Sequence, residues 1–177
     1  MPLGRGLPST VVPLQTRSCR PASSRSSASV ATWRPRQKIG EAFSSLAIEQ
    51  LDEDMVVPLA QIPPLLPKLE EMAAKHHMRP FCFGHVADGN MHLHTMAEPG
   101  VSHEAWRADC VAFLTELYTL VVSLGGTISG EHGIGSKRAP YLPIAPEPAV
   151  IELHRRNKPA FDPNNILNPG KRIVPSG

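Results

Sequence analysis

Cysteine is scarce in this sequence of 177 residues, and its placement argues against both a disulfide framework and a cysteine-based zinc site. The three cysteines, Cys19, Cys82 and Cys110, lie far apart and form no CxxC pair. A disulfide framework uses an even number of cysteines, and a cysteine-based zinc site uses closely spaced pairs. The sequence therefore predicts neither, and it favours a reducing compartment.

Long apolar runs are also missing. The sequence has no apolar stretch of about 18 residues, so we expect no membrane-spanning helix. It also lacks the continuous apolar segment of a secretory signal. The formal net charge is only +2, which gives no reason to expect a nucleic-acid partner.

Acidic residues are absent from the first 38 positions, which are rich in arginine, serine and proline. Such a segment buries little apolar surface, so we expect residues 1–32 to form a disordered basic tail on a mildly acidic domain. An acid-free N-terminus of this kind also suits a mitochondrial transit peptide. We expect a cytoplasmic protein, with the mitochondrial matrix as the alternative.

Beyond the tail, the sequence alternates between helical and extended patterns. Apolar spacing predicts helices at 37–51, 61–77, 102–126 and 146–161, the third capped by Ser102. Extended patterns predict a strand at 54–58 and a hairpin at 79–96. This order indicates an α+β domain, with an antiparallel sheet flanked by helices.

The stretch GHVADGNMHLH, residues 84 to 94, carries three histidines around a turn signal. A two-residue turn at Asp88-Gly89 would place His85 directly opposite His92, with His94 one step along the same face. Imidazoles at that separation of about 5 Å can share one metal ion. The alternative is a solvent-facing hairpin whose histidines only form hydrogen bonds.

A glycine-rich stretch, GGTISGEHGIGSK, supplies further candidates at residues 125 to 137. Glu131 and His132 lie between Gly130 and Gly133, and glycines permit close approach of the backbone to a ligand. An acid beside an imidazole can act as one metal ligand and one general base. A phosphate-binding loop or an ordinary flexible connection remains open as an alternative.

Three motifs in this order, GHVADGNMHLH, GGTISGEHGIGSKR and FDPNNILNPGK, resemble the C-terminal region of FAD-linked oxidases. The resemblance is to the flavin-dependent D-2-hydroxy acid dehydrogenase group, which includes D-lactate and D-2-hydroxyglutarate dehydrogenases and the glycolate oxidase flavin subunit. It covers roughly Trp33 to Val174 and implies the cap, or substrate, domain of the vanillyl-alcohol-oxidase-like flavoproteins. We expect this domain to occupy residues 33–177, in incomplete form, with the FAD-binding domain absent.

The resemblance also implies roles for individual residues. The metal ligands of the family fall on His85, His92 and Glu131, and the expected ion is divalent, with zinc favoured. His132 matches the histidine that takes the proton from the substrate hydroxyl. Ala87 replaces the first glycine of the family's H-x-G-D-G-N pattern, a small change that an extended backbone would tolerate.

Further matches concern the substrate and the flavin. Trp33 and Arg36 match a W-x-x-R pattern whose arginine binds the substrate carboxylate. Asn168 and Lys171 match the tail that returns toward FAD. His94 stands where the hydroxyglutarate enzymes often carry asparagine, which puts that substrate in doubt and makes His94 a candidate substrate donor or additional ligand.

Together, these matches imply oxidation of a lactate- or glycolate-like D-2-hydroxy acid to a 2-oxo acid, with hydride passing to FAD. We expect the isolated chain to be a fragment or split subunit that is inactive alone. Its expected partners are a flavin-binding domain in trans and electron-acceptor subunits. The alternatives are a metal-dependent hydrolase, active in isolation, and a non-catalytic metal-binding or interaction module.

Overall fold

The structure, a computed structural model, describes Lys38 and residues 49–145 and 148–171. The chain divides into two units, Met1–Ile39 and Gly40–Gly177, and the elements named below belong to the second. In chain order they are β1 (Gln50–Val56), η1 (Leu59–Gln61), α2 (Ile62–Lys75), β2 (Met78–His85), η2 (Val86–Asp88), β3 (Asn90–Ala97), α3 (His103–Ser123), α4 (Gly135–Arg138), η3 (Ala139–Ile144) and α5 (Pro148–Phe161), where η marks a 3-10 helix.

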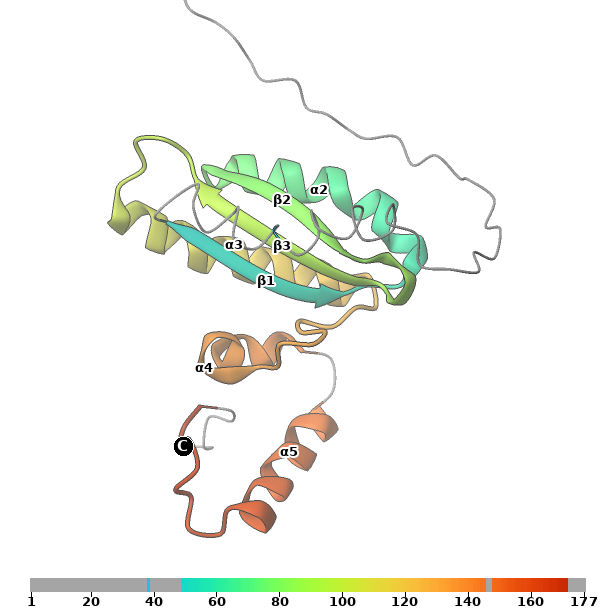
Figure 1. The fold of residues 1–177 in the computed structure, drawn as a ribbon, viewed down its shortest axis with the longest axis vertical. Helices are drawn as coiled ribbons and strands as arrows, with labels where there is room; N and C mark the ends of the chain where they lie inside the picture. The colour runs from blue at the N-terminus through green and yellow to red at the C-terminus, as the bar shows by residue number, and fades with distance from the viewer. Residues whose placement is uncertain (1–37, 39–48, 146–147, 172–177) are drawn as a thin grey trace, which may run out of the picture. The chain divides into compact units, whose positions relative to one another are not determined.

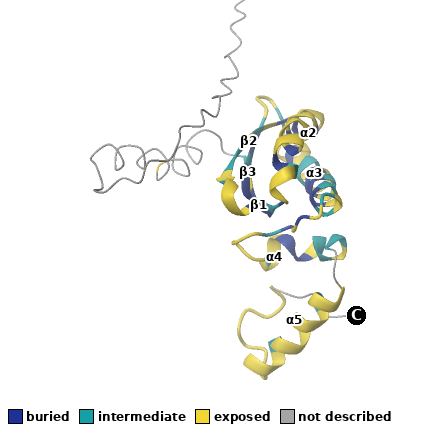
Figure 2. Cartoon of the chain, turned by 90° about the vertical axis from the view of Figure 1, so that its right-hand side faces the viewer, coloured by how far each residue is buried: buried dark blue, intermediate teal, exposed yellow. Residues whose placement is uncertain are grey.

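The three strands form one antiparallel sheet in the order β1-β3-β2. Helices α2 and α3 cover one face of this sheet (Figure 1). Figure 2 shows the buried residues gathered between the sheet and these two helices. The expected α+β fold, with an antiparallel sheet and flanking helices, is confirmed.

The core is built from every second residue of the strands and from the inner faces of α2 and α3. Side chains alternate between the two faces of a strand, so one face of the sheet is apolar. Each fully buried leucine or phenylalanine contributes about 1.5–3 kcal/mol through removal from water. The central members of the core are Leu51, Met55, Met91, Leu93, Leu65, Leu69, Phe113 and Leu117.

Both core helices begin as the sequence predicts. Pro63 and Pro64 lie in the first turn of α2, where a missing N–H costs no hydrogen bond. The Ser102 hydroxyl caps α3 by accepting a hydrogen bond from the Ala105 N–H at 3.2 Å. Among the described residues, no helix is long and apolar enough to cross a lipid bilayer.

The first strand is longer than predicted and starts earlier. The helix expected at 37–51 falls mostly outside the described residues, but its last two positions, Gln50 and Leu51, belong to β1. Leu51 pairs with Thr95 on β3, and its side chain is buried. Pairing with the central strand therefore outweighs the local helical pattern at this point.

The hairpin between β2 and β3 is confirmed, but its predicted two-residue turn is wrong. Residues 86–89 form a four-residue connection, in which η2 is followed by Gly89 with φ of 80°. His85 consequently pairs with Asn90, and His92 pairs with Phe83. An extended backbone was expected at Ala87, but this residue is part of η2. Its φ is not positive, so the methyl group introduces no backbone strain.

Candidate functional site

Three histidines share the face of the sheet that points away from α2 and α3. Leu93 is fully buried in the core, so its neighbours on β3, His92 and His94, point to the opposite face. His85 pairs with Asn90, which lies on that same face of β3. The sequence-based placement of all three imidazoles on one surface is therefore correct, although His85 and His92 are diagonal neighbours.

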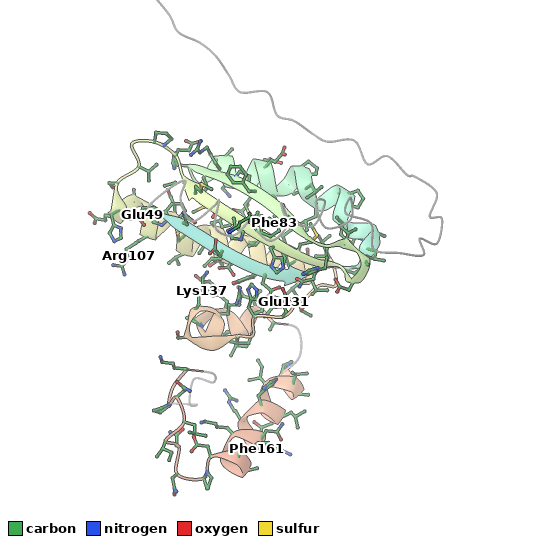
Figure 3. The ribbon with its side chains drawn as sticks, in the orientation of Figure 1. Glu49, Phe83, Arg107, Glu131, Lys137 and Phe161 are labelled. Atoms are coloured by element: carbon green, nitrogen blue, oxygen red, sulfur yellow. The ribbon has the colours of Figure 1, made fainter. Side chains whose placement is uncertain are left out.

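A segment after α3 brings an acid and a fourth histidine to this face. Thr127 anchors it to the end of β1, where its N–H donates to the Val56 carbonyl at 2.9 Å and its carbonyl accepts from the Val56 N–H at 3.1 Å. Glu131 and His132 follow shortly afterwards. Figure 3 shows Glu131 on the part of the chain that runs between the sheet and α4.

His85, His92 and Glu131 form a group that can hold a metal ion. One ligand atom from each lies within 4.8 Å of the others. The Glu131 Oε1 atom is 3.0 Å from His92 Nε2 and 3.8 Å from His85 Nε2. The rings of His85 and His92 meet edge to face, with centroids 5.6 Å apart. Two imidazoles and one carboxylate form a donor set that zinc accepts in catalytic sites with an open position.

His132 lies beside this group. Its ring stacks on that of His92 with centroids 5.2 Å apart, and its Nε2 atom is 3.7 Å from Glu131 Oε1. Its side chain remains about half exposed, at 54%. An imidazole in this position can exchange protons with a molecule that enters the site from solvent.

His94 has a different set of neighbours. Its Nδ1 atom is 2.6 Å from Asp52 Oδ1, and its ring stacks on Phe83 with centroids 5.0 Å apart. Burial lowers the pKa of His94, the charge of Asp52 opposes this, and the nearby His92 adds to the lowering. His94 is not a member of the three-residue group that can hold a metal.

Asp54, on β1, holds the segment that carries Glu131 and His132. Its Oδ2 atom accepts hydrogen bonds from the N–H groups of Gly130 at 2.9 Å and of Glu131 and His132 at 2.8 Å. The Ser129 hydroxyl donates to the same oxygen at 3.2 Å. Burial alone would raise the pKa of Asp54, but these backbone bonds outweigh it, so the pKa lies below its usual value.

Glu53 points to the opposite face and forms a buried ionic cluster. Its Oε2 atom accepts hydrogen bonds from the Tyr118 hydroxyl at 2.5 Å and from Arg138 Nε at 3.2 Å. The Lys137 ammonium lies 2.9 Å from its Oε1 atom. Arg138 is itself buried and donates through Nη1 to the Gly133 carbonyl at 2.9 Å.

The sequence analysis missed Glu53 and Asp54, although a signal for them was present. Glu53 directly precedes, and Asp54 begins, the predicted strand at 54–58, whose other residues are mostly apolar. Because neighbours on a strand face opposite sides, one of the two carboxylates must point into the core. A carboxylate there requires a cation and hydrogen-bond donors, which Arg138 and Tyr118 provide.

The remaining predicted site residues lie elsewhere or outside the described part. Trp33 and Arg36 are not among the described residues. Asn168 and Lys171 are exposed in a turn after α5, where the Lys171 N–H donates to the Asn168 carbonyl at 3.3 Å. The fold thus brings Glu131 and His132 together with the three histidines of the hairpin, His85, His92 and His94.

The sequence that forms this sheet and its group of histidines and glutamate matches a described protein family. Residues 14–172 match the family described as FAD linked oxidases, C-terminal domain. The chain belongs to this family.

Individual relatives make the resemblance more specific. The chain is 40% identical over 139 residues to a D-lactate dehydrogenase of Archaeoglobus fulgidus, and 36% identical over 139 residues to the glycolate oxidase subunit GlcD of Bacillus subtilis. It is 30% identical over 141 residues to a D-2-hydroxyglutarate dehydrogenase of Stutzerimonas stutzeri. Each alignment covers 78% of this chain but only 29–30% of the relative, so the chain spans less than a third of these proteins.

Proposed function

We propose that this chain is the substrate- and metal-binding domain of an FAD-dependent oxidoreductase that converts a D-2-hydroxy acid to a 2-oxo acid. The observation that carries the proposal is the convergence of His85, His92 and Glu131 within 4.8 Å, with His132 against them. Relatives named as D-lactate dehydrogenase and glycolate oxidase subunit support the substrate class. A lactate- or glycolate-like acid fits best, because His94 departs from the hydroxyglutarate pattern.

His85, His92 and Glu131 would hold the metal, which we propose is zinc. His92 is buried, whereas His85 and Glu131 are accessible, so the group opens to solvent on one side. When bound, a divalent ion supplies Lewis acidity, which makes a substrate hydroxyl easier to deprotonate. His132, stacked on His92, is placed to take that proton at Nε2.

The other polar residues would orient the substrate. Arg36 would bind its carboxylate through two parallel hydrogen bonds. His94, held by Asp52 at 2.6 Å, would donate to a second substrate oxygen. The conversion of the 2-hydroxy acid to the 2-oxo acid is balanced by loss of the hydroxyl proton to His132 and of a hydride from the carbon that bears this hydroxyl.

FAD would accept the hydride, and most of its binding surface would come from a flavin-binding domain outside the described residues. Asn168 and Lys171 would contact it from the turn after α5, whose exposed side chains are free of the core. We propose this flavin domain as the main partner, with electron-acceptor subunits as further partners. A cytoplasmic location, or the mitochondrial matrix, would suit such an enzyme.

The test is reconstitution with the flavin-binding domain of the Archaeoglobus fulgidus relative, expressed without its own C-terminal region. We expect reduction of an artificial electron acceptor with D-lactate or glycolate only when both parts and zinc are present. His132→Gln should abolish turnover while zinc binding is retained, and His154→Gln on α5 serves as the control. A folded, flavin-loaded complex that turns over no 2-hydroxy acid would refute the proposal, and hydrolysis by the isolated chain would favour a hydrolase instead.

A further inference from the structure

We propose that Asp54 and Glu53 are positioning residues that clamp the two ends of the segment at residues 129–133, and thereby place Glu131 and His132 for metal binding and proton transfer. The inference rests on the proposed function for the roles of Glu131 and His132. The clamp itself is a structural relationship that can be tested without any catalytic activity.

The segment needs such a clamp because no regular element sets its geometry. Residues 129–133 belong to no helix or strand, and they include Gly130 and Gly133, the second with φ of 74°. The side chains of Glu131 and His132 are each about half exposed, so burial in the core does not hold them either. A metal ligand and a general base must nevertheless stay within a fraction of an ångström of their working positions.

At the first end, Asp54 supplies an anion around which the backbone turns. Three successive N–H groups, those of Gly130, Glu131 and His132, point at its Oδ2 atom. Consecutive amides that converge on one point form a concavity stabilised by negative charge. Asp54 is fully buried, so water does not compete for these bonds, and charge-assisted hydrogen bonds of this kind are about twice as strong as neutral ones.

The close approach of this segment to β1 depends on glycine. A Cβ atom on Gly130 would lie 2.6 Å from Asn90 Oδ1 and 2.8 Å from Asp54 Oδ1. Both distances are shorter than any normal contact, so a larger residue would displace either the segment or the Asn90 and Asp54 side chains against which it lies. The hydrogen bonds to the Asp54 carboxylate therefore depend on glycine at position 130.

At the second end, Glu53 acts through Arg138 from the other face of the sheet. The Arg138 guanidinium is held by Glu53, with Nη2 3.0 Å from Oε2, and it donates through Nη1 to the Gly133 carbonyl at 2.9 Å. The Tyr118 hydroxyl binds the same carboxylate and fixes it against α3. Because adjacent residues of a strand point in opposite directions, one dipeptide reaches the segment from both sides of β1.

The first experiment compares zinc affinity in the full chain, wild type beside Asp54→Asn, by calorimetry with a competing chelator. Asparagine keeps the shape of aspartate but removes the charge that gathers the three amides. We expect zinc affinity to fall about ten- to hundredfold, the usual cost of changing a residue that orients a metal ligand. Asp52→Asn is the matched control, because it removes a charge from the same face of β1 but contacts His94 and not the segment, and it should change affinity less than about threefold.

The second experiment measures amide hydrogen exchange by NMR, which a role limited to overall stability would not affect locally. In the wild-type chain without metal, the amides of Gly130, Glu131 and His132 should exchange as slowly as those of β3. In Asp54→Asn they should exchange freely while β3 stays protected. Arg138→Lys keeps the positive charge beside Glu53 but lacks the planar donor group of arginine. We expect it to lower zinc affinity by a smaller factor than Asp54→Asn does.

The outcomes separate this inference from the proposed function. Zinc affinity unchanged in a folded Asp54→Asn chain, or unprotected amides at 130–132 in the wild type, would overturn the clamp. If Asp54→Asn does not fold, the wild-type exchange rates decide alone. If the wild-type chain binds no zinc, the metal part of the proposed function fails, while slow exchange at these three amides still supports the clamp.

Discussion

The Nε2 atom of His92 lies 3.0 Å from the Oε1 atom of Glu131. His92 is buried on the central strand, whereas the Glu131 side chain is half exposed on a segment without regular structure. The two residues are thus positioned by different means, one by the sheet and the other by hydrogen bonds to its backbone. Changes to either should therefore weaken metal binding by separate routes.

Removal of the proposed ligand His92 should have the larger effect. We expect His92→Ala to lower zinc affinity by more than about a hundredfold, because even residues that only orient a ligand account for ten- to hundredfold. His103→Ala is the control, since His103 is exposed and pairs with Glu49, outside the metal group. Calorimetry and metal analysis after dialysis would check this, and stoichiometric zinc retained by His92→Ala would contradict the ligand assignment.

A change to Gly130 should weaken metal binding without removing any ligand. Gly130→Ala introduces a methyl group 2.6 Å from Asn90 Oδ1 and 2.8 Å from Asp54 Oδ1, so either the segment or the Asp54 side chain that holds it must shift. We expect a loss of zinc affinity of about tenfold or more, as for other changes that displace a ligand. Ser136→Ala, at an exposed position of α4, provides a control of similar size. Wild-type affinity in Gly130→Ala would show that the segment adapts freely.

The core between the sheet and α3 should respond to loss of volume. Leu117 is fully buried, so Leu117→Ala should reduce the free energy of unfolding by about 2–5 kcal/mol. Val111 lies on the same helix but is 60% exposed, and Val111→Ala should change the free energy of unfolding by less than about 0.5 kcal/mol. Urea denaturation followed by circular dichroism measures both, and equal effects would contradict the packing described here.

The free energy of unfolding should fall at low pH, in part because Glu116 becomes protonated. A hydrogen bond from Lys75, and to a lesser extent one from His76, holds the pKa of Glu116 below its usual value. A carboxyl group with a lowered pKa in the folded state stabilises the fold above its unfolded pKa, and this contribution is lost as the pH falls through the folded value. The effect should be small, because the Glu116 side chain is well exposed.

Glu116→Gln should therefore narrow the difference in unfolding free energy between about pH 7 and about pH 3. Denaturant titrations at a series of pH values would measure this difference. Glu70→Gln, on the exposed side of α2, should leave the pH dependence of stability as in the wild type. An identical pH profile in Glu116→Gln and wild type would show that the pair with Lys75 contributes nothing to folding.

Local patterns were sufficient for most of the elements. The apolar spacing predicted α2 and α3, Ser102 marked the start of α3, and the Asp88-Gly89 signal placed the hairpin. These features depend on residues within a few positions of one another, which is why a sequence reveals them. The exact register did not follow, because the turn could close with two residues or with four. The longer connection is favoured by a contact of Gly89 with the residue after β1, since the Gly89 carbonyl accepts from the Val57 N–H at 3.1 Å.

The sequence by itself determined the α+β class, the shared face of His85, His92 and His94, and, through its motifs, the family. Only the tertiary structure decided that Glu131 reaches His92 and that Asp54 and Glu53 hold the segment that carries it. Alternation along a strand is a local rule, so it can be read from the residues in order. The approach of 129–133 to β1 joins positions far apart in the chain, and it exists only because burial of the core brings α3 and its following segment against the sheet.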